Sequence, residues 1–188
     1  MPPIRNAAAT RERLLACAHR RFLNESYENV GLREIAADAG VDVALVGRYF
    51  GSKEQLFKQV LRKDGGNWQS LALEADDLPR LLADLSASKD ASQNAAHIER
   101  LLILLRSASS PQASSLVRSG FSEDVLQPLA TCLSGPDAQL RAAMAMSVLL
   151  GTAIVKSIIS LDVVQECDST KYRDAVAKVM TAALADPK

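Results

Sequence analysis

The sequence contains few of the side chains on which disulfide frameworks, metal sites and β-sheets depend. Its 188 residues include three cysteines, two histidines and one tryptophan, and aromatic residues make up only 4% of the chain. Cys17, Cys132 and Cys167 are odd in number and widely spaced, which argues against a disulfide framework and favours a reducing, cytoplasmic compartment. Alternating runs rich in Val, Ile, Thr and Tyr are missing, so the sequence predicts an all-α protein.

Motifs of the common enzyme and metal-site classes are missing as well. The sequence has no Gly-rich phosphate-binding loop, no nucleophile elbow and no HExxH zinc motif. Cys17 and His19 are two residues apart on a predicted helix and therefore do not share a face, so they do not predict a metal site. We expect a protein that is not an enzyme and that uses no cofactor and no metal.

The sequence also lacks a segment typical of membrane insertion. The N-terminus, MPPIRNAAATRER, has no apolar core of a signal peptide. The most apolar run, residues 142–164, is interrupted by Lys156 and Asp162, which favours a buried core or interface helix over a membrane span.

A net charge of zero conceals an uneven distribution of charge. Residues 1–63 contain 11 Lys and Arg against 7 Asp and Glu, whereas residues 64–188 contain 11 against 15. A basic head on an acidic body fits a module that approaches phosphate at one end only. We expect two domains, a basic head over residues 1–63 and a helical body over residues 64–188, with Gly65-Gly66 at the junction as a candidate hinge.

Residues 31–53, GLREIAADAGVDVALVGRYFGSK, predict two short helices around a tight turn. Ala36 is small enough for the helices to touch, Gly40 allows a left-handed turn, and the β-branched Val46 packs the second helix. Asp42 is expected to cap that helix. The pattern indicates a helix-turn-helix, which presents one helix at a width that the DNA major groove admits.

The other patterns predict helices only, about nine in all, arranged as a three-helix head and a larger helical bundle. Ser52 and Gln55 form a capping box at the start of the fourth helix. The first helix is expected from Thr10 to Asn24, after a loose arm that carries Arg5. Further helices are expected near residues 78–88, 94–109, 137–162 and 170–184.

In combination, Ile35-Ala36-x-x-Ala39-Gly40-Val41 and Tyr49-Phe50-x-Ser52-Lys53-Glu54-x-Leu56 resemble the N-terminal domain of TetR-family transcriptional regulators. The resemblance covers residues 10–62. It implies a homodimeric repressor that binds a palindromic operator in double-stranded DNA and is released by a small-molecule effector in its body. It also implies residues 43–49 as the recognition helix, and DNA contacts by Arg33, Val43, Ala44, Leu45, Arg48, Tyr49 and Lys53.

Two positions depart from the family pattern. The family often has Thr at the start of the second helix and Tyr within the third, where this sequence has Gly31 and Gly47. Each glycine removes a phosphate contact, so we expect a weaker grip on the DNA backbone, offset by Arg48, Arg33 or Arg5. The two glycines keep open an alternative function, a helical protein-interaction module with a degenerate head. A small enzyme is a third and weaker possibility, since only room for a pocket supports it.

The body sequence predicts a dimer and suggests a ligand pocket. Residues 140–159 are apolar on all sides, which a second subunit would explain through a four-helix bundle, although a central core helix is the alternative. The expected interface consists of Leu140, Met144, Val148, Gly151, Val155, Ile159, Tyr172, Val176, Val179 and Met180. Candidate pocket residues, which could equally be ordinary core or surface, are Trp68, His97, Arg100, Phe121 and Met144. We expect an apolar or amphipathic effector.

Overall fold

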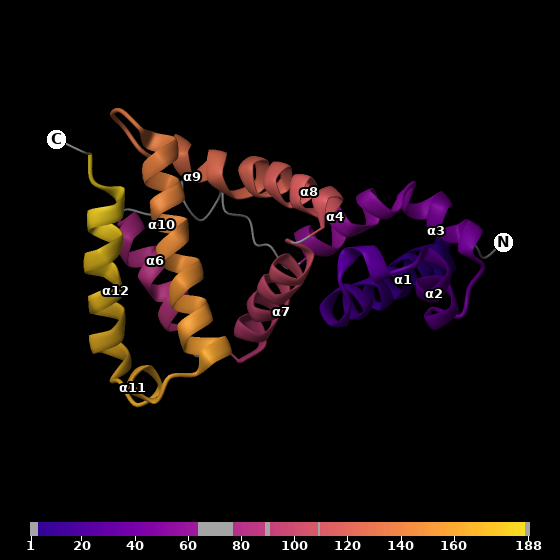
Figure 1. The fold of residues 1–188 in the computed structure, drawn as a ribbon, viewed down its shortest axis with the longest axis horizontal. Helices are drawn as coiled ribbons and strands as arrows, with labels where there is room; N and C mark the ends of the chain where they lie inside the picture. Colours follow the sequence, from indigo (N-terminus) through magenta and orange to yellow (C-terminus); the bar gives the residue numbers. More distant parts are fainter. Residues whose placement is uncertain (1–3, 64–76, 89–90, 109, 187–188) are drawn as a thin grey trace. The chain divides into compact units, whose positions relative to one another are not determined.

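The computed structural model describes residues 4–63, 77–88, 91–108 and 110–186, and within these ranges every regular element is a helix (Figure 1). The predicted all-α class is therefore confirmed. The candidate hinge Gly65-Gly66 lies outside the described residues. The elements are α1 (Ile4–Asn24), η1 (Tyr27–Asn29), α2 (Leu32–Asp38), α3 (Val43–Phe50), α4 (Lys53–Lys63), α6 (Leu78–Ala87), α7 (Ala91–Ser107), α8 (Pro111–Phe121), η2 (Ser122–Leu126), α9 (Gln127–Thr131), α10 (Ala138–Ala153), η3 (Ile154–Ile159), α11 (Asp162–Gln165) and α12 (Ser169–Leu184).

The chain divides into two compact units, and each is described by itself. The first comprises residues 1–66 and 99–119, and the second comprises residues 67–98 and 120–188. The first unit thus contains the helix-turn-helix together with residues 99–119, which belong to α7 and α8. The domain boundary after residue 63 stays a prediction.

Helix ends differ from expectation at two places. The first helix begins at Ile4 rather than after Thr10, which agrees with the high helix propensity of the run Ala7-Ala8-Ala9. The long apolar helix ends its α-helical part at Ala153 and continues as the π-helical turn η3, which stops where Ser160 adopts a left-handed conformation at φ 55°. The remaining expected helices correspond to α6, α7 and α12 within a few residues.

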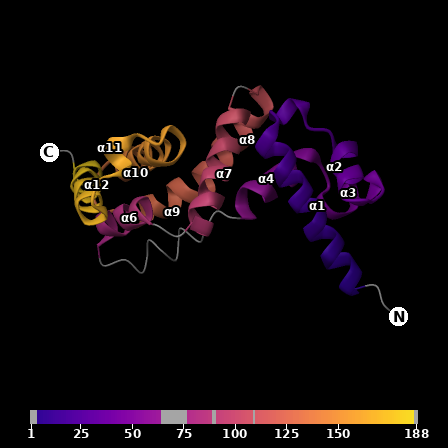
Figure 2. The ribbon, with the colours of Figure 1, turned by 90° about the horizontal axis from the view of Figure 1, so that it is seen from below.

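An aromatic cluster forms the centre of the first unit. Phe22 of α1, Tyr27 of η1 and Phe57 of α4 are each at most 1% exposed. The Phe57 ring meets Phe22 and Tyr27 edge to face, at centroid distances of 4.9 and 5.0 Å. Figure 2 shows α1 beside α2, α3 and α4, the helices that this core joins.

The same core reaches residues far along the chain. Ile103 of α7 and Ala113 of α8 are buried in one cluster with the apolar residues of α1 to α4. Polar contacts join the same parts: Arg106 donates to the backbone carbonyl of Asn24 at 3.4 Å, and His19 lies 3.5 Å from Glu99. Residues 99–119 are therefore packed on the head by both apolar and polar contacts.

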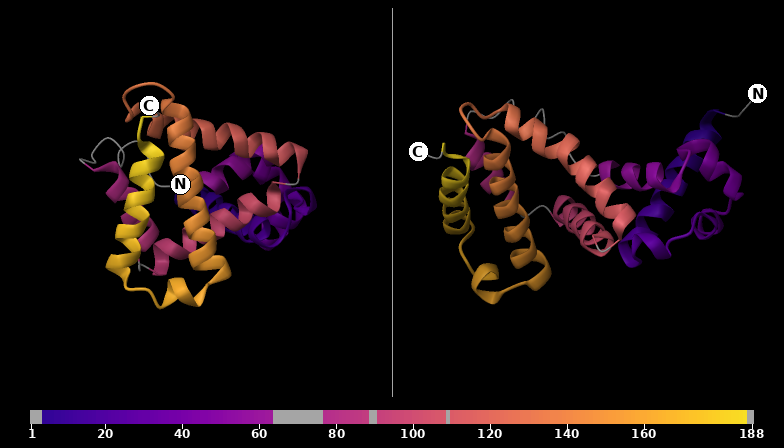
Figure 3. Two further views of the ribbon diagram at one scale, coloured as in Figure 1. Left: turned by 60° about the vertical axis from the view of Figure 1, so that its left-hand side comes forward. Right: turned by 45° about the horizontal axis from the view of Figure 1, so that its top comes forward.

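The second unit is built around α6, α10 and α12, which run side by side in Figure 3. Leu82, Ala145, Val176 and Met180 form its buried centre. Arg141, only 6% exposed, donates to the carbonyl of Leu184 at 3.0 Å and to that of Ser134. Backbone carbonyls accept from both terminal nitrogens of this buried guanidinium, which offsets part of the cost of burying its charge.

We expect Phe57→Ala to destabilise the protein by about 3–5 kcal/mol, because the change leaves a cavity among fully buried rings. Urea unfolding followed by circular dichroism measures the effect. Leu105→Ala, at a side chain that is 50% exposed, is the control and should change the free energy of unfolding by about 0.5 kcal/mol or less. Equal effects of the two substitutions would contradict the assigned core.

Candidate nucleic-acid interface

The turn between α2 and α3 has the geometry that its sequence predicts. Gly40 adopts φ +64°, and its amide donates to the carbonyl of Ala37 while the amide of Val41 donates to that of Ala36, each at 3.0 Å. This pair of bonds is a Schellman motif, which satisfies carbonyls at the end of a helix. Asp42 then caps α3 by accepting a hydrogen bond from the amide of Ala44 at 2.7 Å. The helix-turn-helix geometry is thus set by local backbone rules.

Helix α3 has one buried and one exposed face. Val46 and Phe50 are 1% and 4% exposed, and both belong to the core of the first unit. The opposite face presents Val43, Ala44 and Arg48 to solvent. Of the other expected DNA contacts, Leu45 and Tyr49 are half-buried and Arg33 of α2 is exposed. An exposed helix face with one arginine and small apolar side chains can enter a major groove and contact thymine methyl groups.

The capping box at the start of α4 is present in part. The hydroxyl of Ser52 accepts a hydrogen bond from the amide of Gln55 at 3.3 Å, as the sequence predicts. Lys53 follows directly and opens α4.

The ammonium group of Lys53 lies within the head rather than in open solvent. Its Nζ is 4.4 Å from the centroid of the Tyr27 ring, which is a cation–π distance. Burial lowers the pKa of Lys53, while the negative charges of Glu28, Glu54 and Glu34 act in the opposite direction. The same surroundings raise the pKa of Tyr27 to about 12, through burial first and then the charges of Glu54 and Glu28.

The sequence did not reveal these contacts of Lys53. Its position in the motif suggested only a phosphate contact, because Tyr27, Glu28 and Glu34 approach it through folding; of the three glutamates, only Glu54 is its neighbour in the sequence. The aromatic residue in η1 was the one available signal.

The two glycines that depart from the family pattern lie in different surroundings. At Gly31, the carboxylate of Glu34 occupies the space that a Cβ would take, so a larger residue there requires Glu34 to move. At Gly47, which is exposed on α3, an added Cβ would meet no atom within 4 Å. A side chain added at position 31 would thus meet a carboxylate, whereas one added at position 47 would enter open space.

One arginine near the helix-turn-helix, Arg21, is hydrogen-bonded to carboxylates of the head itself. Arg21 of α1 donates two hydrogen bonds to Asp38 of α2, at 2.6 and 2.9 Å, and a third to Glu25 at 3.1 Å. The hydrogen bond from Arg21 holds the pKa of the Asp38 carboxyl below its ordinary value. This bidentate pair joins α1 to α2.

The family of the chain follows from sequence models. The model described as "Bacterial regulatory proteins, tetR family" matches residues 14–60, over the helices just described. The model described as "Tetracyclin repressor-like, C-terminal domain" matches residues 77–184, which is more than half of the chain. The chain belongs to the tetR family. It is therefore a transcriptional regulator by family, and its fold is that of a regulator rather than of an enzyme.

Solved structures of the same fold agree with this assignment. A TetR-family regulator from Streptomyces coelicolor is 26% identical, with a TM-score of 0.60 over 98% of each chain. NalD of Pseudomonas aeruginosa, a secondary repressor of the MexAB-OprM multidrug efflux pump, is 16% identical, with a TM-score of 0.70 over 96% of this chain and 98% of that one. A complex of SmeT with triclosan is 20% identical, with a TM-score of 0.66 over 95% and 93%. Among curated proteins, no match to the sequence was found.

The expected pocket residues of this TetR-family regulator are distributed over both units. Trp68 and the side chain of His97 lie outside the described residues. Arg100 belongs to the first unit, and Phe121 and Met144 belong to the second. Phe121 packs on the buried cluster around Val125, whereas Met144 is 51% exposed. A common pocket for these residues stays a prediction.

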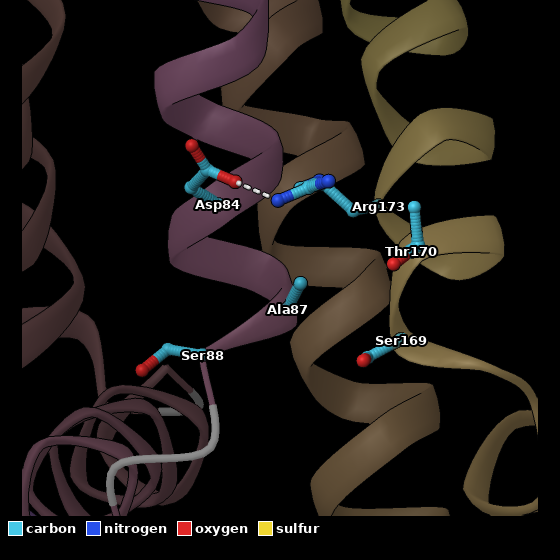
Figure 4. A pocket seen from close by; sticks show the side chains of 6 residues that line it. All are labelled: Asp84, Ala87, Ser88, Ser169, Thr170 and Arg173. Carbon is cyan, nitrogen blue, oxygen red and sulfur yellow. Dashed lines mark ion pairs between the residues drawn. The ribbon is translucent and has the colours of Figure 1, made fainter.

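The second unit of the regulator has a polar hollow that the sequence did not predict (Figure 4). Its volume is about 210 Å³, and Arg173 of α12 and Asp84 of α6 form an ion pair at 3.6 Å across it. Ala87, Ser88, Ser169 and Thr170 complete the lining. Its two halves are far apart in sequence, so no local pattern could indicate it. No group of His, Cys, Asp and Glu that could hold a metal ion occurs within the described residues.

The predicted dimer residues divide into exposed and buried sets. Leu140, Ile159 and Val179 are 50–60% exposed, and Met144 is similar. Val148, Gly151, Val155 and Tyr172 are half-buried. Val176 and Met180, at 6% and 0%, already pack in the core of their own subunit.

We expect Gly47→Ala to stabilise the regulator by about 0.5–1 kcal/mol, because alanine favours helix and the site is open. Thermal unfolding followed by circular dichroism tests this. Gly40→Ala is the matched control: space is open there too, but φ is +64°, so the same substitution should destabilise. A shift in the same direction at both positions would contradict the role assigned to helix propensity.

Proposed function

We propose that this regulator binds a palindromic operator as a homodimer, represses transcription from it and is released by an apolar or amphipathic small molecule. The observation that carries the proposal is the exposed face of α3, with Arg48 and small apolar side chains, held in place by the buried Val46 and Phe50. A twofold axis would place two such helices in successive major grooves. Since it acts on bacterial DNA, its compartment would be the cytoplasm.

The proposed contacts follow from the chemistry of each side chain. Val43, Ala44 and Leu45 offer methyl groups that suit thymine, and Arg48 is able to donate two hydrogen bonds to guanine or to a phosphate. Tyr49, Lys53 and Arg33 would hold phosphates. NalD, which is named a repressor, and SmeT, which is seen with triclosan, support repression and small-molecule release as the mode of action.

Release requires that the effector bind more tightly to a form of the dimer that does not fit the operator. The effector can shift the equilibrium only by its difference in affinity for the two forms. Small-molecule sites in proteins are lined mostly by apolar side chains, which supports an apolar or amphipathic effector.

Purified protein should enrich a palindrome from a pool of random-sequence duplexes. In binding assays with the enriched duplex, Arg48→Ala should weaken affinity about tenfold per head and reduce the salt slope by about one per head, about two for the dimer, if Arg48 holds a phosphate. Fluorescence anisotropy at several salt concentrations gives both quantities.

The matched control is Arg80→Ala, which removes the same charge from an exposed position in the second unit and should leave DNA binding unchanged. Enrichment of no sequence, with only weak salt-sensitive binding, would refute the proposed function. It would favour the alternative of a protein-interaction module with a degenerate head.

The dimer is proposed to form through α10 and α12. The run Ala138–Ile159 is apolar and long enough to cross a membrane by composition, with a mean hydropathy of 1.9, but a single such helix is weak evidence for a span. Only 17% of this window is buried within the chain, and Leu140, Met144, Ile158 and Ile159 are exposed large apolar side chains of the run. A Cβ added at Gly151 would meet nothing within 4 Å, which leaves room for a partner helix. A four-helix bundle of two subunits would bury this surface.

The double substitution Leu140→Glu and Met144→Glu should convert the dimer to a monomer, because both carboxylates would have to be desolvated in the interface. Light scattering after size-exclusion chromatography measures the mass. Leu105→Glu, at an equally exposed leucine of the first unit, should leave the mass of the dimer unchanged. A wild-type protein that is monomeric at all concentrations would contradict the proposed interface.

A further inference from the structure

The ammonium group of Lys53 can pair either with a carboxylate of the head or with a DNA phosphate. Its ammonium lies over the Tyr27 ring, and the carboxylates of Glu28, Glu54 and Glu34 act on it, with Glu28 contributing the largest of these charge effects. A lysine head group has three donors and a flexible stem, so it is able to turn toward a carboxylate or toward a DNA phosphate. A group that hydrogen-bonds to one of these carboxylates therefore affects how readily Lys53 pairs with a DNA phosphate.

Glu28 is held by Ser110, the residue that precedes α8. The hydroxyl of Ser110 donates a hydrogen bond to Oε1 of Glu28. The hydroxyl oxygen of Ser110 in turn accepts a hydrogen bond from the amide of Ala113 at 3.1 Å, so Ser110 also caps α8. Ser110 is only 4% exposed, whereas Glu28 is exposed. The partner of Glu28 is thus a fixed group at the start of a helix.

The region around Ser110 is part of the first unit. Residues 99–119 belong to that unit, and Arg106 and Glu99 of α7 contact α1. Helix α8 continues along the chain past Ser119 into the second unit, so it connects the body covalently to Ser110, the hydrogen-bond partner of Glu28.

We propose that Glu28 is a positioning residue for DNA binding, which Ser110 holds back from Lys53. While the Ser110 hydroxyl donates to Glu28, part of the carboxylate is occupied and Lys53 is able to leave the Tyr27 ring for a phosphate. When α8 withdraws the hydroxyl, Glu28 pairs with Lys53 and the head loses one phosphate contact. The inference rests on the proposed DNA-binding function, and it names the side chains through which α8 would change it.

The expected effects can be measured with the palindrome enriched from the duplex pool. Ser110→Ala should weaken binding about fivefold per head, the size of one exposed ion pair, and reduce the salt slope by about one per head, about two for the dimer. Ser110→Thr keeps a hydroxyl for both Glu28 and the cap, and should retain the wild-type affinity. In the background of Glu28→Gln, where the competing charge is gone, Ser110→Ala should have no effect.

The Glu28→Gln background separates this relay from simple loss of the α8 cap. If Ser110→Ala weakens binding equally with Glu28 and with Gln at position 28, the cap explains the effect and the inference is wrong. It is also wrong if Ser110→Ala leaves affinity and salt slope unchanged. Glu166→Gln, an exposed carboxylate of the second unit, controls for net charge and should leave binding unchanged.

A second readout does not depend on DNA. Lysine side chains labelled with 13C at Cε are titrated by NMR, and Lys53 is assigned by the signal lost in Lys53→Arg. Ser110→Ala should raise the pKa of Lys53, because a closer carboxylate favours the ammonium, and should not raise it when position 28 is Gln. An unchanged pKa in the single variant would overturn the relay, whereas absence of any enriched duplex would refute only the proposed function.

Discussion

The head depends on the packing of three aromatic rings. Phe57 meets Phe22 and Tyr27 edge to face, and the three rings tie α4, α1 and η1 into one core. Helix α3 has only two large buried side chains, Val46 and Phe50. Its position therefore depends on the packing of these two side chains in the core. An eight-residue helix is not stable alone in water, because most helical stability in proteins comes from tertiary packing. The position of the exposed face of α3 therefore depends on the packing of the three aromatic rings.

Tyr27 connects this core to the chemistry at the surface. Its ring is packed between Phe22 and Phe57, and the Lys53 ammonium lies over it at 4.4 Å. A fixed ring gives the lysine a defined position, which an exposed lysine on a flexible stem lacks. The same residue thus contributes to the stability of the head and to the position of one candidate phosphate contact.

Features of the helix-turn-helix that depend on neighbouring residues could be predicted from the sequence. Gly40 takes the left-handed conformation, Asp42 and Ser52 cap their helices, and Val46 and Phe50 are buried, because each follows from rules that act within one or two turns. The surroundings of Lys53 could not, because Tyr27 and Glu28 precede it by more than twenty residues. The packing of residues 99–119 on the head was missed for the same reason.

The apolar body helix shows a different limit of sequence reasoning. Residues 140–159 are apolar on several faces, and a pattern of this kind cannot say which face belongs to the subunit and which to a partner. Within the subunit, Ala142, Ala145 and Met146 are buried, whereas Leu140 and Met144 are exposed. In α12, Val176 and Met180 are buried and Val179 is exposed. The expected interface therefore includes residues of the subunit's own core as well as exposed residues.

The formal charge of the head overstates what DNA would encounter. Arg21 is bound to Asp38 and Glu25, and the charge of Lys53 is shared with three glutamates. A cation already paired with a carboxylate releases fewer counterions when DNA arrives, so it adds little to the salt dependence. Arg33 and Arg48, exposed on α2 and α3, are placed to supply the charge-dependent part of binding. In the proposed function, phosphate contacts position the head and base contacts specify the site, so specificity would depend on the apolar side chains of α3 and on Arg48.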